Sequence, residues 1–530
     1  MKDNKRSEFS TSGLRLERNA DLSPHFETVD GRKVLYVDGW PHCVLTVEIY
    51  WGDLIYGRHH ETMHVYDYLY PAARALGLNA IKVPVKWSMI EPQKGVYDFS
   101  YLDHIKRLAE ENGLKLVVGW FGHYASGDGN IYRNLTGEVF APMYVIEDDV
   151  TYPKAVDAHG VTHHNAISYE YEPILEVETA AFRAFMEHIK AVDAEKRTIV
   201  MVQVENEIAV FGSDRRNRAM WRDHTPAANK RFQEMGFTDD LKYSAWRLSS
   251  AWIRRLTDAG AEVYPLPFFL NYVGGQIVPW MVGGAPGEDV ATYMENCPNL
   301  SFIGLNLYAS RKSSVDDFRT RLSAYRAGGN TPAITETNSD AGPNTPRLAY
   351  LAVGEFGVPI FAPWALHISY PTPFEPYVLP DGTIAHGGPA FRDCCLSLRK
   401  ALPLIAYYAN TEKLAVFMAP YPGEGYSVVR DINGAEVRFT SAAWGPEPSD
   451  GQAIVIHPTE NEFLIVGYRC GLSITTPMAR WPAAKQVRVE RGVWQDGQWQ
   501  SEGDYPHTLN QSNSTINVGL SEPVAVYVRW

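Results

Sequence analysis

Two segments of the chain place carboxylates directly after an apolar run. In the first, the apolar residues 199–202 lead into Glu205, Asn206 and Glu207. In the second, a shorter apolar run leads into Glu336. Polar side chains at the end of a buried strand are costly unless they form hydrogen bonds or serve a function. The alternative for both segments is that the strand has already ended and the carboxylates face solvent in a loop.

Hydrolysis of a glycosidic bond requires two carboxyl groups on opposite sides of the sugar carbon. One group protonates the leaving oxygen, and the other attacks the sugar or activates a water molecule. Glu207 and Glu336 lie far apart in the sequence, so they can cooperate only if the fold brings the ends of their strands to one cleft. The two segments therefore predict a catalytic pair, with no metal or other cofactor.

The elements around these residues indicate an α/β fold, a (β/α)8 TIM barrel. Continuous apolar strands alternate with amphipathic helices, which is typical of a parallel sheet covered by helices. The expected strands are 43–49, 78–87, 114–121, 197–207, 262–273, 300–308, 331–337 and 358–366. The expected helices are 63–76, 100–112, 177–193, 242–259, 315–327 and 388–408. Catalytic groups of such a barrel lie at the carboxyl ends of the strands.

Three regions are expected along the chain. Residues 1–20 read as a flexible polar arm, and residues 21–411 as the catalytic barrel. From residue 412 to residue 530 the helical pattern stops, and short alternating segments are separated by turn residues. This pattern is typical of an all-β domain, and we expect a sandwich.

Composition excludes several classes of function. Lys and Arg number 49 against 62 Asp and Glu, a net charge of −13, which is unfavourable for binding nucleic acid or an anionic membrane. Five cysteines without a C-x-x-C pair predict neither a disulfide framework nor a zinc site. Adjacent histidines at 59–60 and 163–164 are expected in surface loops. No signal peptide or long apolar stretch is visible, so we expect a cytoplasmic protein, and the oligomeric state stays open, homo-oligomers included.

Several motifs resemble glycoside hydrolase family 35, the β-galactosidase family, within the clan of retaining (β/α)8 glycosidases. V-Q-V-E-N-E at 202–207 resembles the acid/base strand of that family, and P-A-I-T-E-T at 332–337 the nucleophile strand of a bacterial branch. The stretch W-S-M-I-E-P-Q-K-G-V-Y-D-F from residue 87 and the segment 296–308 resemble two further strands of the clan. That branch also has a β-rich C-terminal domain, so the resemblance covers about residues 30–520.

The resemblance implies a role for each residue of these motifs. Glu207 would be the general acid/base, and Asn206 would hydrogen-bond the 2-hydroxyl of the sugar. Glu205 would be a supporting carboxylate. Glu336 would be the nucleophile, and Tyr308 would donate a hydrogen bond that keeps it ionised and aimed.

The chain also departs from the family. The family's acidic residue near the first strand corresponds to Glu48, but its acidic residue after the third strand has no counterpart. Trp120, His123 and Tyr124 stand there instead. Because these positions contact the hydroxyl groups of the sugar, the departure leaves galactose specificity open while the carboxylate pair is intact.

Four further residues are candidates for the sugar site. Trp87, Trp120 and Trp364 lie at or near strand ends and could form a stacking floor, and Asn271 could face the cleft; for each the alternative is a place in the core. The leading prediction is a retaining exo-β-glycosidase, first a β-galactosidase acting on oligosaccharides. The alternatives are a transglycosidase, a β-glycosidase for another sugar such as glucose, and a non-catalytic carbohydrate-binding protein.

Overall fold

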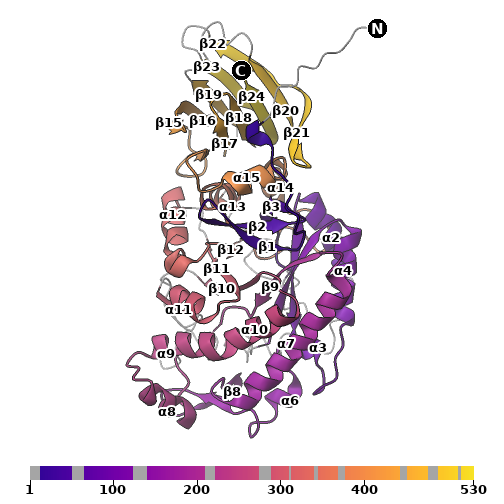
Figure 1. The fold of residues 1–530 in the computed structure, drawn as a ribbon, viewed down its shortest axis with the longest axis vertical. Coiled ribbons are helices and arrows are strands. Elements are labelled where there is room, and N and C mark those ends of the chain that lie inside the picture. Colours follow the sequence, from indigo (N-terminus) through magenta and orange to yellow (C-terminus); the bar gives the residue numbers. More distant parts are fainter. Residues whose placement is uncertain are drawn as a thin grey trace.

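The computed structural model describes twelve parts of the chain. These are residues 12–49, 65–122, 140–208, 210, 221–273, 288–308, 312–338, 344–367, 376–441, 450–475, 487–510 and 515–530. Figure 1 shows the barrel and, beyond one end of it, a smaller β-domain at the C-terminus.

Eight parallel strands form the barrel, in the order β4-β13-β12-β11-β10-β9-β6-β5. They are β4 (Val44–Leu45), β5 (Ala80–Lys86), β6 (Lys115–Phe121), β9 (Ile199–Val204), β10 (Phe268–Val273), β11 (Leu300–Asn306), β12 (Ile334–Glu336) and β13 (Ile360–Phe361). Beyond β4, Glu48 bridges Lys82 of β5 and closes the ring, with the Ile49 amide 2.9 Å from the Lys82 carbonyl. The predicted (β/α)8 barrel is confirmed, and each of the eight predicted segments contains its strand.

Amphipathic helices surround the strands because each has one apolar face to bury. They are α2 (Tyr66–Ala75), α4 (Ser100–Glu111), α7 (Glu172–Asp193), α10 (Arg254–Val263), α11 (Glu288–Asn296), α12 (Val315–Ala324), α13 (Asn344–Tyr350), α14 (Gly388–Arg399) and α15 (Leu402–Tyr408). The helix predicted at 242–259 is interrupted: α9 (Asp240–Arg247) passes through a π-helical segment, η4 (Leu248–Ile253), into α10. Helix α7 begins five residues earlier than predicted, with Pro173 in its first turn.

The connection between the third and fourth barrel strands carries elements that the sequence patterns did not predict. They include α6 (Met143–Ile146) and the hairpin β7 (Lys154–Val156)–β8 (Thr162–Ile167). After the fourth strand comes α8 (Pro226–Glu234), and after the second the short α3 (Trp87–Ile90). These elements are too short to give a clear period, which is why pattern reading passes over them.

A three-stranded antiparallel sheet closes the amino end of the barrel. It consists of β1 (His25–Val29), β2 (Arg32–Val37) and β3 (Trp40–His42), joined by turns at Asp30–Gly31 and Asp38–Gly39. Leu35 and Val37 of β2 join an apolar cluster inside the barrel, and the rings of Phe26 and Phe302 are 6.0 Å apart. This end of the barrel is therefore a packed core.

The C-terminal domain is a sandwich of two antiparallel sheets. One contains β14 (Leu414–Met418), β17 (Gln452–Thr459), β18 (Glu462–Tyr468), β24 (Val524–Arg529), β20 (Arg488–Gln495) and β21 (Gln498–Asp504). The other contains β15 (Tyr426–Ile432), β16 (Ala435–Ser441), β19 (Cys470–Thr475), β23 (Thr515–Leu520) and β22 (His507–Asn510). Their inner faces share one apolar cluster.

The flexible arm predicted for residues 1–20 is wrong for the residues around Leu14. Leu14 is fully buried, and its carbonyl accepts a 2.6 Å hydrogen bond from the indole of Trp494 in the C-terminal domain. The Gly13 amide donates to Glu462 of the same domain. The prediction rested on the polar composition of residues 1–20 and did not take the single apolar residue Leu14 into account. Residues 1–11 lie outside the described part of the chain.

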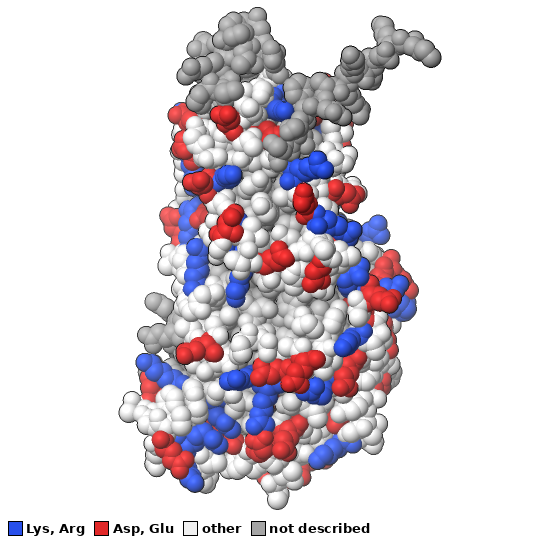
Figure 2. Space-filling view, in the orientation of Figure 1, with Lys and Arg blue, Asp and Glu red and all other residues white. Residues whose placement is uncertain are grey.

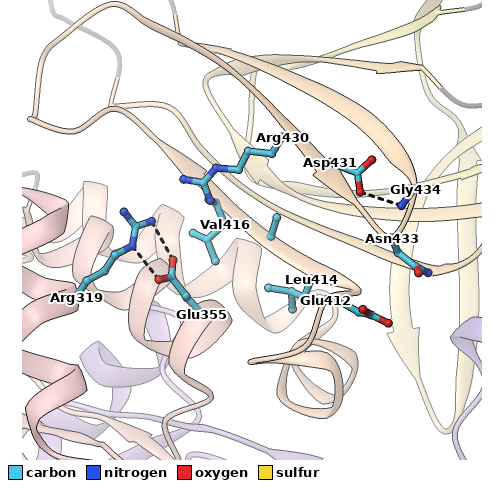
Figure 3. A pocket seen from close by; sticks show the side chains of 10 residues that line it. Arg319, Glu355, Glu412, Leu414, Val416, Arg430, Asp431, Asn433 and Gly434 are labelled. Atoms are coloured by element: carbon cyan, nitrogen blue, oxygen red, sulfur yellow. Dashed lines mark hydrogen bonds and ion pairs between the residues drawn. The ribbon is translucent and has the colours of Figure 1, made fainter.

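A polar cavity of about 650 Å³ lies where the C-terminal domain meets the barrel. Figure 3 shows Arg319 and Glu355 on the barrel side and Arg430 on the domain side. Arg319 donates to both carboxylate oxygens of Glu355, at 2.8 and 2.9 Å. This ion pair lies within the barrel, and neither Glu207 nor Glu336 lines the cavity, so the cavity belongs to the domain junction.

The surface and the thiols give few functional signals. In Figure 2, acidic and basic side chains are interspersed over the visible face rather than gathered into one patch. All five cysteines are free and buried. Within the described ranges, no cluster of three or more metal-binding side chains is found. Among the same residues, no helix is both long enough and apolar enough to cross a membrane.

Candidate active site

The segment Glu205–Glu207 forms a tight turn at the carboxyl end of β9, the fourth barrel strand. Glu205 and Glu207 have positive φ angles, 78° and 47°. The Glu205 amide donates to the Trp120 carbonyl at 2.9 Å, and the Glu205 carboxylate accepts from the Gly122 amide. Glu205 is therefore anchored to the end of β6 and is 1% exposed, which fits the predicted supporting role.

Glu336 is the last residue of β12, the seventh barrel strand, and is 5% exposed. The Tyr308 hydroxyl donates to its Oε2 at 2.5 Å, as the resemblance implied. The Asn271 amide donates to its Oε1 at 2.9 Å. Both oxygens of this carboxylate thus have a neutral donor.

Asn271, on the fifth strand, connects the two predicted catalytic segments. Its Nδ2 donates to Glu336 and also, at 2.7 Å, to Oδ1 of Asn206. Its Oδ1 accepts from the Glu207 amide at 2.9 Å. One side chain therefore links the turn after β9 to the end of β12, and the structure brings Glu207 and Glu336 to the same end of the barrel.

Asn306 is a site residue that the sequence reasoning missed. Its Nδ2 donates to Oε1 of Glu207 at 2.9 Å, and its Oδ1 accepts from the Thr335 hydroxyl at 2.9 Å. Asn306 lies two residues before Tyr308 at the end of β11. Because side chains two apart in a strand share a face, this spacing could have identified it.

Lys82 is a second missed residue and is the partner of Glu48. Its Nζ lies 2.6 Å from Oε2 of Glu48 and 3.3 Å from the Thr335 carbonyl, and both charged side chains are 1% exposed. A lysine in the interior of the apolar strand 80–86 was the available signal. Glu48 does lie at the carboxyl end of the barrel, but one of its oxygens is held by Lys82; contact with a sugar stays a prediction.

The surroundings of the two glutamates raise the pKa of both. Burial raises the pKa of Glu207 to about 7; the hydrogen bond from Asn306 opposes this effect, and the charge of Glu48 adds to it. Burial and then repulsion from Glu207 raise the pKa of Glu336 well above its ordinary value. Because ionisation of one glutamate disfavours ionisation of the other, the pair loses its two protons in separate steps, and the intermediate form holds one proton.

The hydrogen-bond donors indicate which group holds that proton. Glu336 accepts from both Tyr308 and Asn271, whereas among the described residues Glu207 accepts a side-chain hydrogen bond from Asn306 alone. Donors stabilise the ionised form of a carboxyl group. The donors therefore favour an ionised Glu336 and a protonated Glu207, the states required of a nucleophile and an acid, and they oppose the larger rise that burial and repulsion give to the pKa of Glu336.

Two of the three predicted stacking tryptophans belong to the core. Trp87 and Trp120 are fully buried, and Trp120 packs against Phe182 and Phe185 of α7. A ring with no exposed face cannot stack on a sugar in this structure, so the prediction is corrected for these two. Trp364, which bridges Glu48 and Asn338 at the end of the eighth strand, is only half-buried. His123 and Tyr124 lie outside the described residues.

Comparisons with known proteins extend this description. Residues 35–130 match the model of "Glycosyl hydrolases family 35", and residues 397–504 match "Domain of unknown function (DUF5597)". No curated protein sequence is significantly similar to the chain. The family 35 match covers the first three barrel strands but neither Glu207 nor Glu336.

Solved structures of glycosidases are similar in fold. The catalytic domain of a β-amylase from Paenibacillus polymyxa is 12% identical, with 66% of this chain and 97% of that chain covered and a TM-score of 0.50. A β-galactosidase from the psychrophilic Marinomonas ef1 is 13% identical, with 68% and 61% covered and a TM-score of 0.48. The chain thus spans less than two thirds of that galactosidase, and likeness at such identity concerns the fold alone.

A closed (β/α)8 barrel with two glutamates at the carboxyl ends of its strands is an arrangement found in (β/α)8-barrel glycoside hydrolases. Over residues 35–130 the chain is similar to glycosyl hydrolase family 35, the family that the motifs at 202–207 and 332–337 also resemble.

Proposed function

We propose that the chain is a retaining β-glycosidase that removes a terminal sugar by double displacement. The observation that carries this proposal is the bridge through Asn271, which ties a doubly hydrogen-bonded Glu336 to the turn bearing a half-buried Glu207. It gives two carboxyl groups at one barrel end with unequal donor sets, as a nucleophile and an acid require.

In the first step, Glu336 would attack the anomeric carbon while Glu207 transfers its proton to the leaving oxygen. The glycosidic bond breaks and an ester bond forms between the sugar and Glu336. In the second step, Glu207 would take a proton from water, and the resulting oxygen displaces Glu336. Tyr308 and Asn271 would hold Glu336 throughout, and Asn306 would aim Glu207.

We propose a β-galactoside as the first substrate class, because the family resemblance points to it. The same residues would also serve transfer to an acceptor sugar. The third barrel strand contributes no carboxylate at its described end, and Glu48 is paired with Lys82. The residues that would select the sugar hydroxyls thus differ from the family pattern, so glucosides and other sugars belong in the same test.

The test is a panel of p-nitrophenyl β-glycosides, followed by NMR with and without an acceptor sugar. We expect turnover of at least one β-glycoside, with the β-anomer as the first product. An α-anomer as the first product would exclude double displacement. Sugar binding without turnover of any substrate would instead support the non-catalytic alternative.

A further inference from the structure

The turn that carries Glu207 is strained and must be held by its neighbours. Left-handed backbone is unfavourable for a non-glycine residue, and Glu205 and Glu207 both adopt it. Such conformations persist where surrounding contacts over-determine them. On one side the contacts come from β10, through Asn271; on the other they come from the end of β6, through the Trp120 carbonyl and the Gly122 amide.

Behind the end of β6 lies a buried carboxylate that the proposed chemistry does not use. Glu178 of α7 is fully buried and accepts hydrogen bonds from the indoles of Trp120 at 3.2 Å and Trp252 at 2.9 Å, and from the Tyr169 hydroxyl at 3.1 Å. Within the described residues no Lys or Arg forms an ion pair with it. Burial raises its pKa to about 7, while the three donors oppose that rise.

A buried carboxylate at position 178 is expected to lower the stability of the fold. Desolvating a carboxylate without a cation costs several kcal/mol even when it accepts hydrogen bonds. Buried groups with strongly shifted pKa values concentrate at functional sites. Glu178 therefore calls for a role beyond packing.

Glu178 also lies directly against the backbone that anchors Glu205. A Cβ atom at Gly122 would overlap Oε1 of Glu178, and it would lie 2.7 Å from the indole nitrogen of Trp120. The carboxylate of Glu178 thus contacts the segment 120–122 on one side. On the other side, the Trp120 carbonyl and the Gly122 amide form hydrogen bonds with Glu205. Only glycine leaves room for this close approach.

We propose that Glu178 is a positioning residue for the acid/base: it fixes the segment Trp120–Gly122, and through Glu205 this segment sets the turn on which Glu207 stands. This inference rests on the proposed function of Glu207. Glu178 contacts neither predicted catalytic carboxylate by hydrogen bond, so it would act only through this chain of contacts.

Two substrates with different leaving groups distinguish a misplaced acid from a general loss of structure, because only one of them needs a proton from Glu207. A dinitrophenyl β-glycoside needs no proton to leave, whereas a methyl β-glycoside does. For E178Q we expect kcat/KM to fall about tenfold on the methyl glycoside and less than about twofold on the dinitrophenyl glycoside. G122A displaces the same segment and should show the same split. Because the comparison is a ratio, an inactive fraction of the protein does not affect it.

Glu462 provides a matched control. It is 2% exposed and, like Glu178, accepts from neutral donors among the described residues, namely Gly13, Thr459 and Tyr527, but it lies in the C-terminal domain. E462Q should leave the ratio between the two substrates unchanged. An equal loss on both substrates in E178Q, no loss on either, or a larger loss on the dinitrophenyl glycoside would overturn the proposal. A wild-type protein that hydrolyses neither substrate would instead refute the proposed function.

Discussion

The same strands carry apolar side chains at the amino end of the barrel and polar side chains at its carboxyl end. At the amino end, the inward residues are apolar and pack with β2; they are Val44, Ala80, Val117, Val200, Phe269, Phe302, Ala333 and Ile360. Toward the carboxyl end, the same strands present polar side chains: Glu48 forms an ion pair with Lys82, Asn271 donates to Glu336, and Asn306 donates to Glu207. The change occurs within a few residues along each strand.

This difference indicates that stability and chemistry are separated along the barrel axis. The apolar end gains free energy from burial, whereas the polar end spends some of it on buried carboxylates. Variants at the two ends should therefore have opposite signatures. A variant at the polar end should lose activity with little loss of stability, and a variant at the apolar end should do the reverse.

Removal of the nucleophile should have the largest effect. For E336A we expect turnover to fall on the order of 10⁶-fold, the scale observed when an enzyme loses its nucleophile. Azide could then attack only the opposite face of the sugar and should give the α-glycosyl azide, identified by NMR. Near-wild-type activity, or a β-azide product, would mean that Glu336 is not the nucleophile.

Removal of the acid/base should come next. For E207A we expect a loss of about 10²–10⁴-fold on substrates with poor leaving groups, the usual contribution of general acid catalysis. Activated substrates should still form the glycosyl-enzyme, and azide should restore their turnover and give the β-glycosyl azide. The two alanine variants should thus yield opposite anomers; the same anomer from both would contradict the assigned roles.

At the apolar end, F302A should act on stability. Its ring is fully buried against Phe269 and Phe26, so truncation should lower the free energy of unfolding by about 3–5 kcal/mol. Turnover per correctly folded molecule should stay within twofold of wild type, about 0.4 kcal/mol. Urea unfolding and titration of active sites would measure the two quantities separately. A loss of turnover with unchanged stability would contradict the claim that the apolar end serves stability and the polar end serves activity.

The matching variant at the polar end is E207Q, which should stabilise the protein while it impairs turnover. The folded-state pKa of Glu207 is raised to about 7, so the folded protein loses stability as pH rises from the ordinary glutamate value to about 7. Glutamine removes that loss, which we expect to be on the order of 1–3 kcal/mol. Urea midpoints should show a larger advantage of E207Q at pH 8 than at pH 5. An advantage that is largest at low pH would contradict this assignment.

The smallest expected effects are shifts of the pH profile. The hydrogen bond from Asn306 lowers the pKa of Glu207, so N306A should raise it and move the alkaline limb of kcat/KM to higher pH. The Tyr308 hydroxyl lowers the pKa of Glu336, so Y308F should move the acid limb to higher pH. Movement of either limb to lower pH would count against the donor assignments.

The candidate site was predictable in part. An apolar run that ends in polar residues identified Glu205, Asn206, Glu207 and Glu336, and the family resemblance gave Asn206 and Tyr308 their roles. Asn271 was named as a residue that could face the cleft, but its role as a bridge between two strands was not visible. Lys82 and Asn306 were missed because their partners, Glu48 and Glu207, are distant in the sequence.

The sequence by itself determined the order of strands and helices, because alternation and helical periodicity are local properties of the chain. Only the tertiary structure decided which side chains of a strand face the barrel interior. That depends on how the strands are staggered when the sheet closes and on which helix packs outside. Trp120 is the clearest example: its place at a strand end is local, but its burial against α7, with its indole on Glu178, follows from the closed barrel.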